Sequence, residues 1–431
     1  MLRPYAAAAA TAGQEQGRLD EAVGLSLALG LHVAAAEAAP LRQISPRTYL
    51  GSGRVERLKE EAEELGAGVI VMDAPLSPVQ QRNLEQDIGA KVIDRTGLIL
   101  EIFGLRAQTK EGRLQVELAR QGYERSRLVR TWTHLERQRG GLGKTGGPGE
   151  TQIELDRRII AERIIKLKRE LEEVRRTRGL QRRARSRAGL PAVVLVGYTN
   201  AGKSTLFNRL TQAGVLAKDM LFATLDPTAR QVRLPSGRAV IVSDTVGFIS
   251  DLPHELVEAF RATLEAVTEA DLLLHVRDIA HPESDKQRAD VIALLAQLAK
   301  GADGKSPPVL EVWNKIDQLD APTREARLRR ANAVGEGEGA PVAISAVTGE
   351  GLDALLIAID RAAFSATRII TVTLAAAEGK LRAQIAAVGR VLEENSDEEG
   401  NITLRAELLV ADAARFALLE PLLETPKLAA E

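Results

Sequence analysis

Eight consecutive residues near the middle of the chain have the types and spacing of a phosphate-binding loop. They follow a short apolar run at residues 192–196, which is typical of a buried strand, and they precede a helical pattern at 205–210. A glycine-rich loop between a strand and a helix directs backbone N–H groups at an anion, while a lysine reaches the terminal phosphates and a serine hydroxyl binds Mg²⁺. The pattern G-x-x-x-x-G-K-S therefore predicts a nucleoside triphosphate site with Mg²⁺, formed by Gly197, Tyr198, Thr199, Asn200, Ala201, Gly202, Lys203 and Ser204.

A second motif follows the predicted strand at 239–243. Asp244 ends this strand in a position from which a carboxylate holds Mg²⁺ through water. Gly247 offers a backbone N–H to a γ-phosphate with no side chain in the way. A D-x-x-G sequence alone is common, but its place after the phosphate loop makes Asp244, Thr245, Val246 and Gly247 a specific signal.

Two further segments select the base. Asp317 presents two carboxylate oxygens that suit the N1–H and exocyclic amine of guanine, whereas adenine has no such pair of donors. A loop after the predicted strand at 342–344 can place a backbone N–H near the guanine O6. These residues predict that the nucleotide is GTP or GDP: Asn314, Lys315, Ile316 and Asp317, and then Ser345, Ala346 and Val347.

The segment between the first two motifs resembles a mobile switch loop. Such a loop supplies a threonine hydroxyl to Mg²⁺ when triphosphate is bound. We expect Thr224 to be that residue, with Thr228 as the alternative, and a simple turn before Pro227 would also explain the pattern. The predicted metal ligands are Ser204 and Thr224, and the predicted switch residues are Phe222, Ala223, Thr224, Leu225 and Asp226.

Position 248 is unusual for a switch of this kind. In Ras-like proteins the residue after the D-x-x-G glycine is a glutamine that orients the attacking water. Phe248 has no group that forms a hydrogen bond, so the catalytic residue is unknown from the sequence. We expect slow intrinsic GTP hydrolysis that a partner accelerates.

Composition limits the class of protein. The chain has 431 residues, enough for two to four domains, and it has no cysteine, so disulfides and thiol catalysis are excluded. No apolar run approaches the roughly 20 residues of a membrane helix. We expect a cytoplasmic protein without membrane insertion, and a monomer.

Charge is distributed unevenly along the chain. Residues 106–187 contain 23 Lys and Arg against 11 Asp and Glu, although the whole chain has a net charge of −1. Such a block favours contact with RNA phosphates, although a solvated helix end would also explain it. A glycine-rich loop at 140–149 is either a close RNA contact or a flexible connector. The cluster consists of Arg175, Arg176, Arg178, Arg182, Arg183, Arg185 and Arg187.

Periodicity predicts four units in an α/β chain. Residues 1–112 form an α/β domain with strands at 69–72 and 91–94 and a helix at 77–87. Residues 113–187 form a long basic helical hairpin, because apolar side chains recur at spacings of 3, 4 and 7. Residues 188–366 form a P-loop GTPase domain with a doubly wound parallel sheet. Residues 367–431 form a small α+β domain, with strands at 369–374 and 401–409, a helix at 376–392 and an acidic turn at 393–400.

Several segments outside the nucleotide motifs resemble the HflX family of GTPases. The resemblance covers nearly the whole chain, while residues 121–126 are more polar than in the family pattern. In the first domain it is carried by residues 76–78, 81–84 and 94–100. In the helical part it is carried by residues 114–119, 132–138 and 146–152, and in the switch loop by residues 222–226.

This resemblance implies more than the residues themselves. HflX-like proteins bind the 50S ribosomal subunit, and their first two domains reach toward the peptidyl-transferase region of the 23S rRNA. With GTP bound they split stalled or stress-damaged 70S ribosomes, and the ribosome stimulates hydrolysis. Two alternatives stay open: a GTPase whose N-terminal domain is a separate ATP-dependent RNA-remodelling enzyme, and a signalling switch that binds protein effectors.

Overall fold

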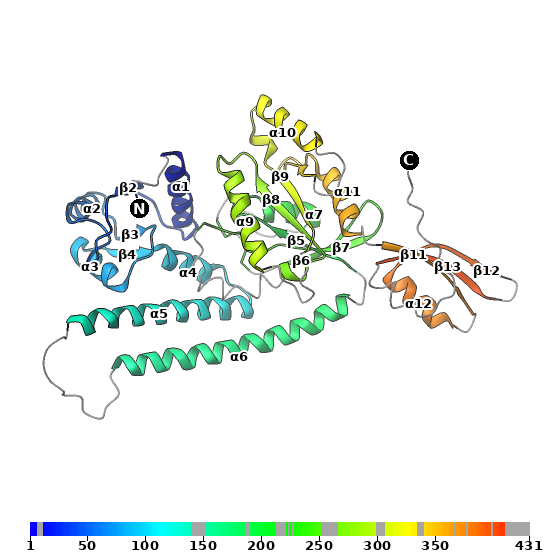
Figure 1. Cartoon of the computed structure of the whole chain (residues 1–431), viewed down its shortest axis with the longest axis horizontal. Helices are drawn as coiled ribbons and strands as arrows, with labels where there is room; N and C mark the ends of the chain where they lie inside the picture. Colours follow the sequence, from blue (N-terminus) through cyan, green and yellow to red (C-terminus); the bar gives the residue numbers. More distant parts are fainter. Residues whose placement is uncertain are drawn as a thin grey trace.

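The computed structural model places an N-terminal, a central and a C-terminal unit side by side, and the fourth unit, a helical hairpin, lies beneath the first two (Figure 1). The N-terminal unit, the hairpin and the central unit contain the parts that position the nucleotide motifs. Among the described residues, no helix combines the length and apolar composition needed to cross a membrane. The described residues are 1–6, 12–138, 152–186, 190–212, 221–222, 224–225, 228–250, 266–298, 307–333, 340–364, 367–375, 378–397 and 400–409.

The N-terminal unit is a four-stranded parallel sheet in the order β2-β1-β3-β4, with helices on both faces. Helices α2 and α3 share one apolar cluster with the sheet, and α1 and α4 share another on the opposite face. Its strands are β1 (Leu2–Ala6), β2 (Glu37–Leu41), β3 (Val69–Met72) and β4 (Lys91–Asp94). Its helices are α1 (Ala12–Ala28), α2 (Ser52–Glu64), α3 (Pro78–Ile88) and α4 (Arg95–Arg106).

Local signals explain the elements that the sequence predicted here. The Ser77 hydroxyl accepts from the Gln80 N–H while the Gln80 side chain accepts from the Ser77 N–H, which forms a capping box at the start of α3. Gly89 ends that helix in a left-handed conformation. The predicted strands at 69–72 and 91–94 are confirmed, whereas β1, β2, α1 and α4 were not predicted.

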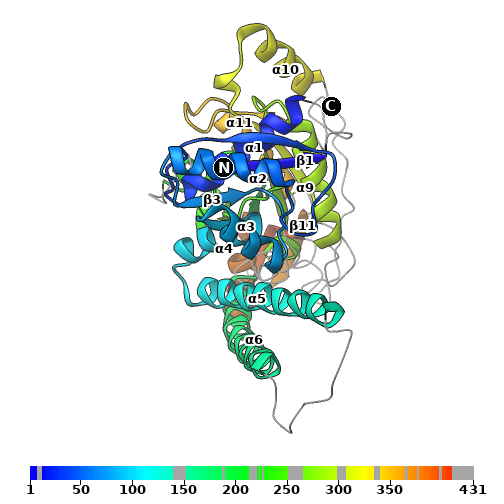
Figure 2. The same cartoon turned by 90° about the vertical axis from the view of Figure 1, so that its left-hand side faces the viewer.

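The helical hairpin consists of α5 (Lys110–Gln138) and α6 (Gln152–Ser186). Figure 2 shows α5 below the N-terminal unit and α6 below α5. The predicted apolar stripe is buried at Ile164, Leu167 and Leu171. The glycine-rich loop at 140–149 lies outside the described residues.

The central unit is a six-stranded sheet in the order β10-β9-β8-β5-β7-β6, in which β6 is antiparallel to β7. Helices α7 and α11 pack on one face, and α9 packs on the other, as a doubly wound sheet requires. The strands are β5 (Ala192–Val196), β6 (Ala229–Arg233), β7 (Ala239–Ser243), β8 (Leu272–Asp278), β9 (Val309–Asn314) and β10 (Val342–Ala343). The helices are α7 (Lys203–Thr211), α9 (Ser284–Leu298), η1 (Ile316–Gln318), α10 (Ala321–Ala333) and α11 (Leu352–Ala363).

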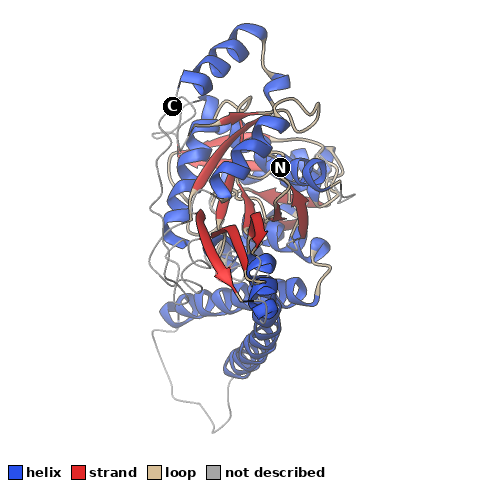
Figure 3. Cartoon of the chain, turned by 90° about the vertical axis from the view of Figure 1, so that its right-hand side faces the viewer, coloured by secondary structure: helices blue, strands red, loops and turns tan. Residues whose placement is uncertain are grey.

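The C-terminal unit has a separate antiparallel sheet, which Figure 3 shows with the strands in red. Its elements are β11 (Thr367–Leu374), α12 (Gly379–Val388), β12 (Arg390–Ser396) and β13 (Ile402–Leu409). The predicted helix at 376–392 and the acidic turn at 393–400 are therefore wrong in part. The helix ends before Gly389, and two of the acidic residues, Glu393 and Glu394, belong to β12, where Glu393 lies 3.6 Å from Arg405 on β13.

The predicted fold class is confirmed by this order of units. The boundaries at residues 112, 187 and 366 stay predictions, and the first falls inside α5, which begins at Lys110.

Candidate functional site

The phosphate loop leaves β5 and enters α7 as predicted. Gly202 caps α7 with a φ of 91°, and a Cβ there would lie 2.2 Å from the Asn314 Nδ2 atom, so only glycine fits. Lys203 is buried, and its Nζ donates to the carbonyls of Gly197 (3.1 Å) and Tyr198 (2.8 Å). Burial lowers the pKa of Lys203 to about 8, although the nearby Asp244 carboxylate opposes this shift. The lysine is thus held across the loop whose N–H groups would receive the phosphates.

Three oxygen-bearing side chains converge beside this lysine. The Ser204 Oγ lies 2.8 Å from the Thr224 Oγ1 and donates to the Asp244 Oδ2 at 2.7 Å. Burial raises the pKa of the Asp244 carboxyl, and the Lys203 ammonium together with hydrogen bonds from Ser204 and Thr224 opposes the rise. Hydroxyl and carboxylate oxygens are the ligands that Mg²⁺ prefers, so this donor set fits the ion. Of the two candidate threonines, the structure brings Thr224 to Ser204.

The D-x-x-G glycine packs directly against the phosphate loop. A Cβ on Gly247 would lie 2.8 Å from the Thr199 Cα and 2.9 Å from the Lys203 Nζ, closer than any side chain allows. The next residue is fixed on both sides, because the Thr199 N–H donates to the Phe248 carbonyl (2.7 Å) and the Phe248 N–H donates to the Gly197 carbonyl (3.0 Å). Gly247 therefore lies beside the Lys203 ammonium.

The Phe248 side chain belongs to the core. It is 8% exposed and shares an apolar cluster with Tyr198, Val267 and Val291 on the α9 face of the sheet. The switch position that carries a catalytic glutamine in Ras-like proteins thus carries a packing residue here.

The residues predicted to bind the base, 314–317 and 345–347, are of two kinds: some hold loops together, and others are exposed. Asn314 braces two loops, since its Nδ2 donates to the Ala201 carbonyl (2.8 Å) and its Oδ1 accepts from the Ala346 N–H (2.9 Å). The Lys315 ammonium lies 2.8 Å from the Asp278 carboxylate. Ile316 and Ser345 are buried, whereas the Asp317 side chain and that of Val347 are exposed. Asp317 is thus the acidic residue of the motif that a base can reach.

The switch loop is anchored in the N-terminal unit. Phe222 and Leu225 are buried in the apolar cluster that contains α1 and α4, and the Phe222 ring meets the Phe103 ring edge-on at 4.7 Å between centroids. Their side chains therefore point away from a nucleotide, and a contact would have to come from their backbone. Thr245 donates to the Leu195 carbonyl (2.6 Å) and Val246 is half-buried, while Ala223 and Asp226 lie outside the described residues.

The arginine cluster lies in the last turns of α6, and Arg187 lies outside the described residues. The helix prediction is confirmed here, and the RNA contact stays a prediction.

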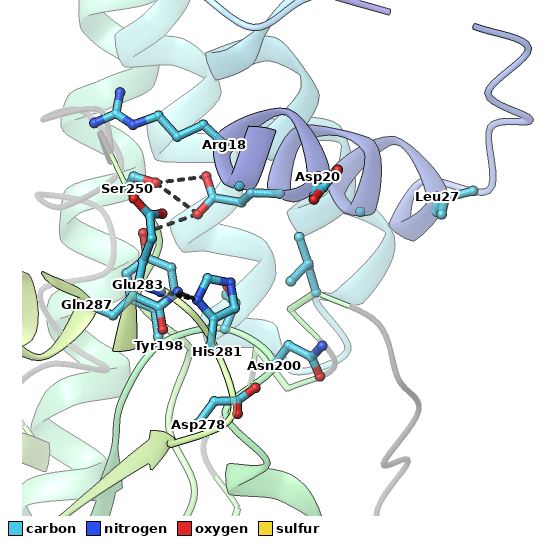
Figure 4. Close-up of a pocket in the computed structure, with 15 residues that line it drawn as sticks. Arg18, Asp20, Leu27, Tyr198, Asn200, Ser250, Asp278, His281, Glu283 and Gln287 are labelled. Carbon is cyan, nitrogen blue, oxygen red and sulfur yellow. Dashed lines mark hydrogen bonds between the residues drawn. The ribbon is translucent and has the colours of Figure 1, made fainter. Parts of the chain in front are cut away.

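Sequence reasoning missed that the N-terminal unit takes part in the site. A cavity of about 290 Å³ lies between α1 and the phosphate loop, and Figure 4 shows Asp20 and Leu27 on α1 across from Tyr198, Asn200 and Asp278. Tyr198 donates through its hydroxyl to Glu21 of α1 at 3.1 Å. No local pattern around Glu21 signals this contact, because it joins residues 177 positions apart.

Comparisons with known proteins cover most of the chain. Sequence models of four protein families match: GTP-binding GTPase N-terminal (16–104), GTP-binding GTPase middle region (106–185), 50S ribosome-binding GTPase (192–315) and HflX C-terminal domain (332–420). The GTPase HflX of Magnetococcus marinus is 51% identical over 402 residues, which is 93% of this chain and 90% of the relative. The GTPase HflX of Escherichia coli is 43% identical over 378 residues, 88% and 86% of the two chains.

Solved structures also align with this chain. A GTP-binding protein from Sulfolobus solfataricus, solved in complex with GDP, is 24% identical and has a TM-score of 0.45. That alignment covers 84% of this chain and 98% of the other.

Proposed function

We propose that this chain, which belongs to the HflX family of GTPases, binds GTP with Mg²⁺ and uses the GTP cycle to act on the ribosome in the cytoplasm. The observation that carries the proposal is the convergence at one sheet edge of Lys203, the Ser204–Thr224–Asp244 oxygens and Gly247. Each of these groups suits one part of a bound nucleoside triphosphate.

Different residues bind different parts of the nucleotide. The phosphate-loop N–H groups and the Lys203 ammonium hold the phosphates, and the Gly247 N–H is placed to recognise the γ-phosphate. Asp317 accepts from guanine, and Ser204 and Thr224 would hold Mg²⁺ directly while Asp244 holds it through water. When bound, the ion neutralises charge on the phosphates.

Hydrolysis by the free protein is proposed to be slow. Phe248 faces the core and supplies no group to orient water. A partner must then complete the site, either by ordering the switches or by adding a charged or polar group.

We propose the large ribosomal subunit as that partner. The family model that matches residues 192–315 is described as a 50S ribosome-binding GTPase, and the helical hairpin carries an excess of positive charge that suits rRNA phosphates. In its GTP state the protein would bind the 50S subunit, contact 23S rRNA through the hairpin, and split or rescue stalled 70S ribosomes.

Gradient sedimentation tests this function. Purified ribosomes are centrifuged with the protein and GTP, GDP or a non-hydrolysable GTP analogue, and the protein and free subunits are quantified. We expect binding to the 50S fraction and loss of 70S with the analogue but not with GDP, and loss of both effects in Lys203→Ala. Equal sedimentation with all nucleotides, or none with any, would overturn the proposal. Lys286→Ala, which removes an exposed lysine paired with Glu283 (3.2 Å), is the matched control.

A further inference from the structure

Two charged residues of the N-terminal unit hold the segment that follows Gly247. Glu21 on α1 accepts hydrogen bonds from the Ser250 hydroxyl at 2.9 and 2.8 Å, and from the Tyr198 hydroxyl at 3.1 Å. Burial and the Glu21 carboxylate both raise the pKa of Tyr198, so its phenol stays a donor. One carboxylate thus joins α1 to the phosphate loop and to the switch II segment, which we define as residues 247–250.

Arg95, the first residue of α4, completes this contact. Its guanidinium donates to the Ser250 carbonyl (2.8 Å), to Glu21 (2.6 Å) and to Asp73 (2.6 Å). Arg95 is 7% exposed, and Asp73 also pairs with the buried Arg3. Burial disfavours the charged form of Arg95, but the two carboxylates outweigh it and raise its pKa. The guanidinium is therefore a fixed cation in a position set by three acceptors.

The switch II segment is pinned at both ends. Near its start the Phe248 backbone is bonded to Gly197 and Thr199 of the phosphate loop. At its end Ser250 is bonded to Glu21 and Arg95, and Ile249 is 6% exposed in the apolar cluster that contains α4. This path places Gly247 beside the Lys203 Nζ.

We infer that Glu21 and Arg95 are positioning residues that hold the Gly247 N–H where a γ-phosphate meets it, and so favour GTP over GDP. This inference rests on the proposed GTP site and extends it into the N-terminal unit. A segment already held in its binding conformation loses less conformational entropy when the ligand arrives. GDP has no γ-phosphate and does not use Gly247, so its affinity does not depend on these two residues.

The N-terminus of α4, where Arg95 lies, also contacts the hairpin. Asp94, the neighbour of Arg95, accepts from the Tyr123 hydroxyl of α5 at 2.8 Å and from the Gly97 N–H at 2.8 Å. Coupling between two sites is reciprocal, so a γ-phosphate that depends on Arg95 also stabilises the docking of the N-terminal unit. The hairpin is attached to the N-terminal unit, so a change in the docking of that unit between the GTP and GDP states would also move the hairpin.

Nucleotide affinity measured by calorimetry on the full chain tests the inference. Glu21→Ala, Arg95→Ala and Ser250→Ala are each titrated with GDP and with a non-hydrolysable GTP analogue. We expect the Kd for the analogue to rise about tenfold in the first two, within the range of measured site couplings, and less in Ser250→Ala, while the Kd for GDP changes less than about twofold. Glu21→Gln, which keeps an acceptor oxygen, should give an intermediate effect.

If Glu21 and Arg95 only stabilised the fold, the effect of the substitutions on the two Kd values would differ from this expectation. General damage to the fold would weaken both nucleotides together, so equal losses, or unchanged affinity for the analogue, would overturn the inference. If Arg95→Ala does not fold, Ser250→Ala decides, because it removes one hydroxyl from a half-buried position. Arg47→Ala, which breaks an exposed pair with Asp87 in the same unit, is the matched control. Wild-type protein that binds neither nucleotide would contradict the proposed function and the inference with it.

Discussion

At the scale of single residues, Phe248 is the reason we propose that hydrolysis needs a partner. Ras-like proteins have a catalytic glutamine at this position of the motif. The Phe248 side chain, however, lies in the core beside Tyr198 and Val267. We expect Phe248→Gln to leave intrinsic GTP hydrolysis slow and to lower the free energy of unfolding by roughly 2–4 kcal/mol, since an amide replaces a buried ring. Single-turnover hydrolysis and thermal melting check this. A large rate increase without destabilisation would contradict the placement.

We propose that Asp317 determines the base preference. Its carboxylate is exposed and would accept from two donors of guanine, and an amide at this position would reverse one of those hydrogen bonds. We expect Asp317→Asn to weaken GTP binding by on the order of 100-fold or more and to improve binding of xanthosine triphosphate, which has a carbonyl where guanine has an amine. Competition binding with both nucleotides checks the swap. An unchanged preference for GTP over xanthosine triphosphate would show that Asp317 does not contact the base.

The sequence predicts the phosphate, metal and base motifs because each is a short, ordered pattern next to a strand. The strand and helix around the phosphate loop are confirmed as β5 and α7, and the ligand roles of the motif residues stay predictions. The sequence could not identify Glu21 and Arg95, since their roles depend on how two units pack. Nor could it show that Asn314 braces the loops at Ala201 and Ala346, because only the folded chain brings them together.

At the scale of elements, strand β8 contains a buried titratable residue. Burial lowers the pKa of His275 to about 4, with Glu311 opposing the shift and Arg277, Arg288 and Lys203 adding to it. The unfolded chain therefore takes up this proton first as the pH falls, and stability is lost between about pH 6.5 and 4. The loss from this residue is roughly 3 kcal/mol.

Substitution isolates this contribution. Urea unfolding of His275→Gln across that pH range should show a shallower fall in the free energy of unfolding than the wild type, whereas His32→Gln, at an exposed position, should match it. Identical pH profiles for wild type and His275→Gln would show that His275 titrates alike in both states.

Element prediction succeeded where local signals are complete and failed where they compete. Helix α3 has a capping box at its start and Gly89 at its end, and its predicted bounds are correct within a residue. The helix predicted at 376–392 stops early, because Gly389 interrupts it and the following residues pair with β13 instead. Strand pairing depends on residues far apart in the sequence, so it can override a local pattern that is typical of a helix.

The end of α6 is the element expected to contact rRNA. Reversing the charge of Arg182, Arg183 and Arg185 should weaken binding to the 50S subunit and reduce its salt dependence, since fewer counterions are released. Co-sedimentation over a salt series measures both. Unchanged affinity at every salt concentration would mean that these arginines are only a solvated helix end.

At the scale of the whole molecule, both switch segments pack against the N-terminal unit. Phe222 and Leu225 lie in its core, and Ser250 is held by Glu21 and Arg95. The hairpin is attached to the same unit through Asp94 and Tyr123. A ribosome that binds the hairpin would thus act on the nucleotide site through a continuous set of packed contacts.

We propose that the large ribosomal subunit completes a GTPase site in which Phe248 supplies no group to orient water. The direct measurement is the GTP hydrolysis rate of the purified protein alone, with 50S subunits and with 30S subunits. We predict slow turnover alone and with 30S, and an increase of roughly tenfold or more with 50S. Rapid turnover by the protein alone, or equal rates under all three conditions, would contradict the account.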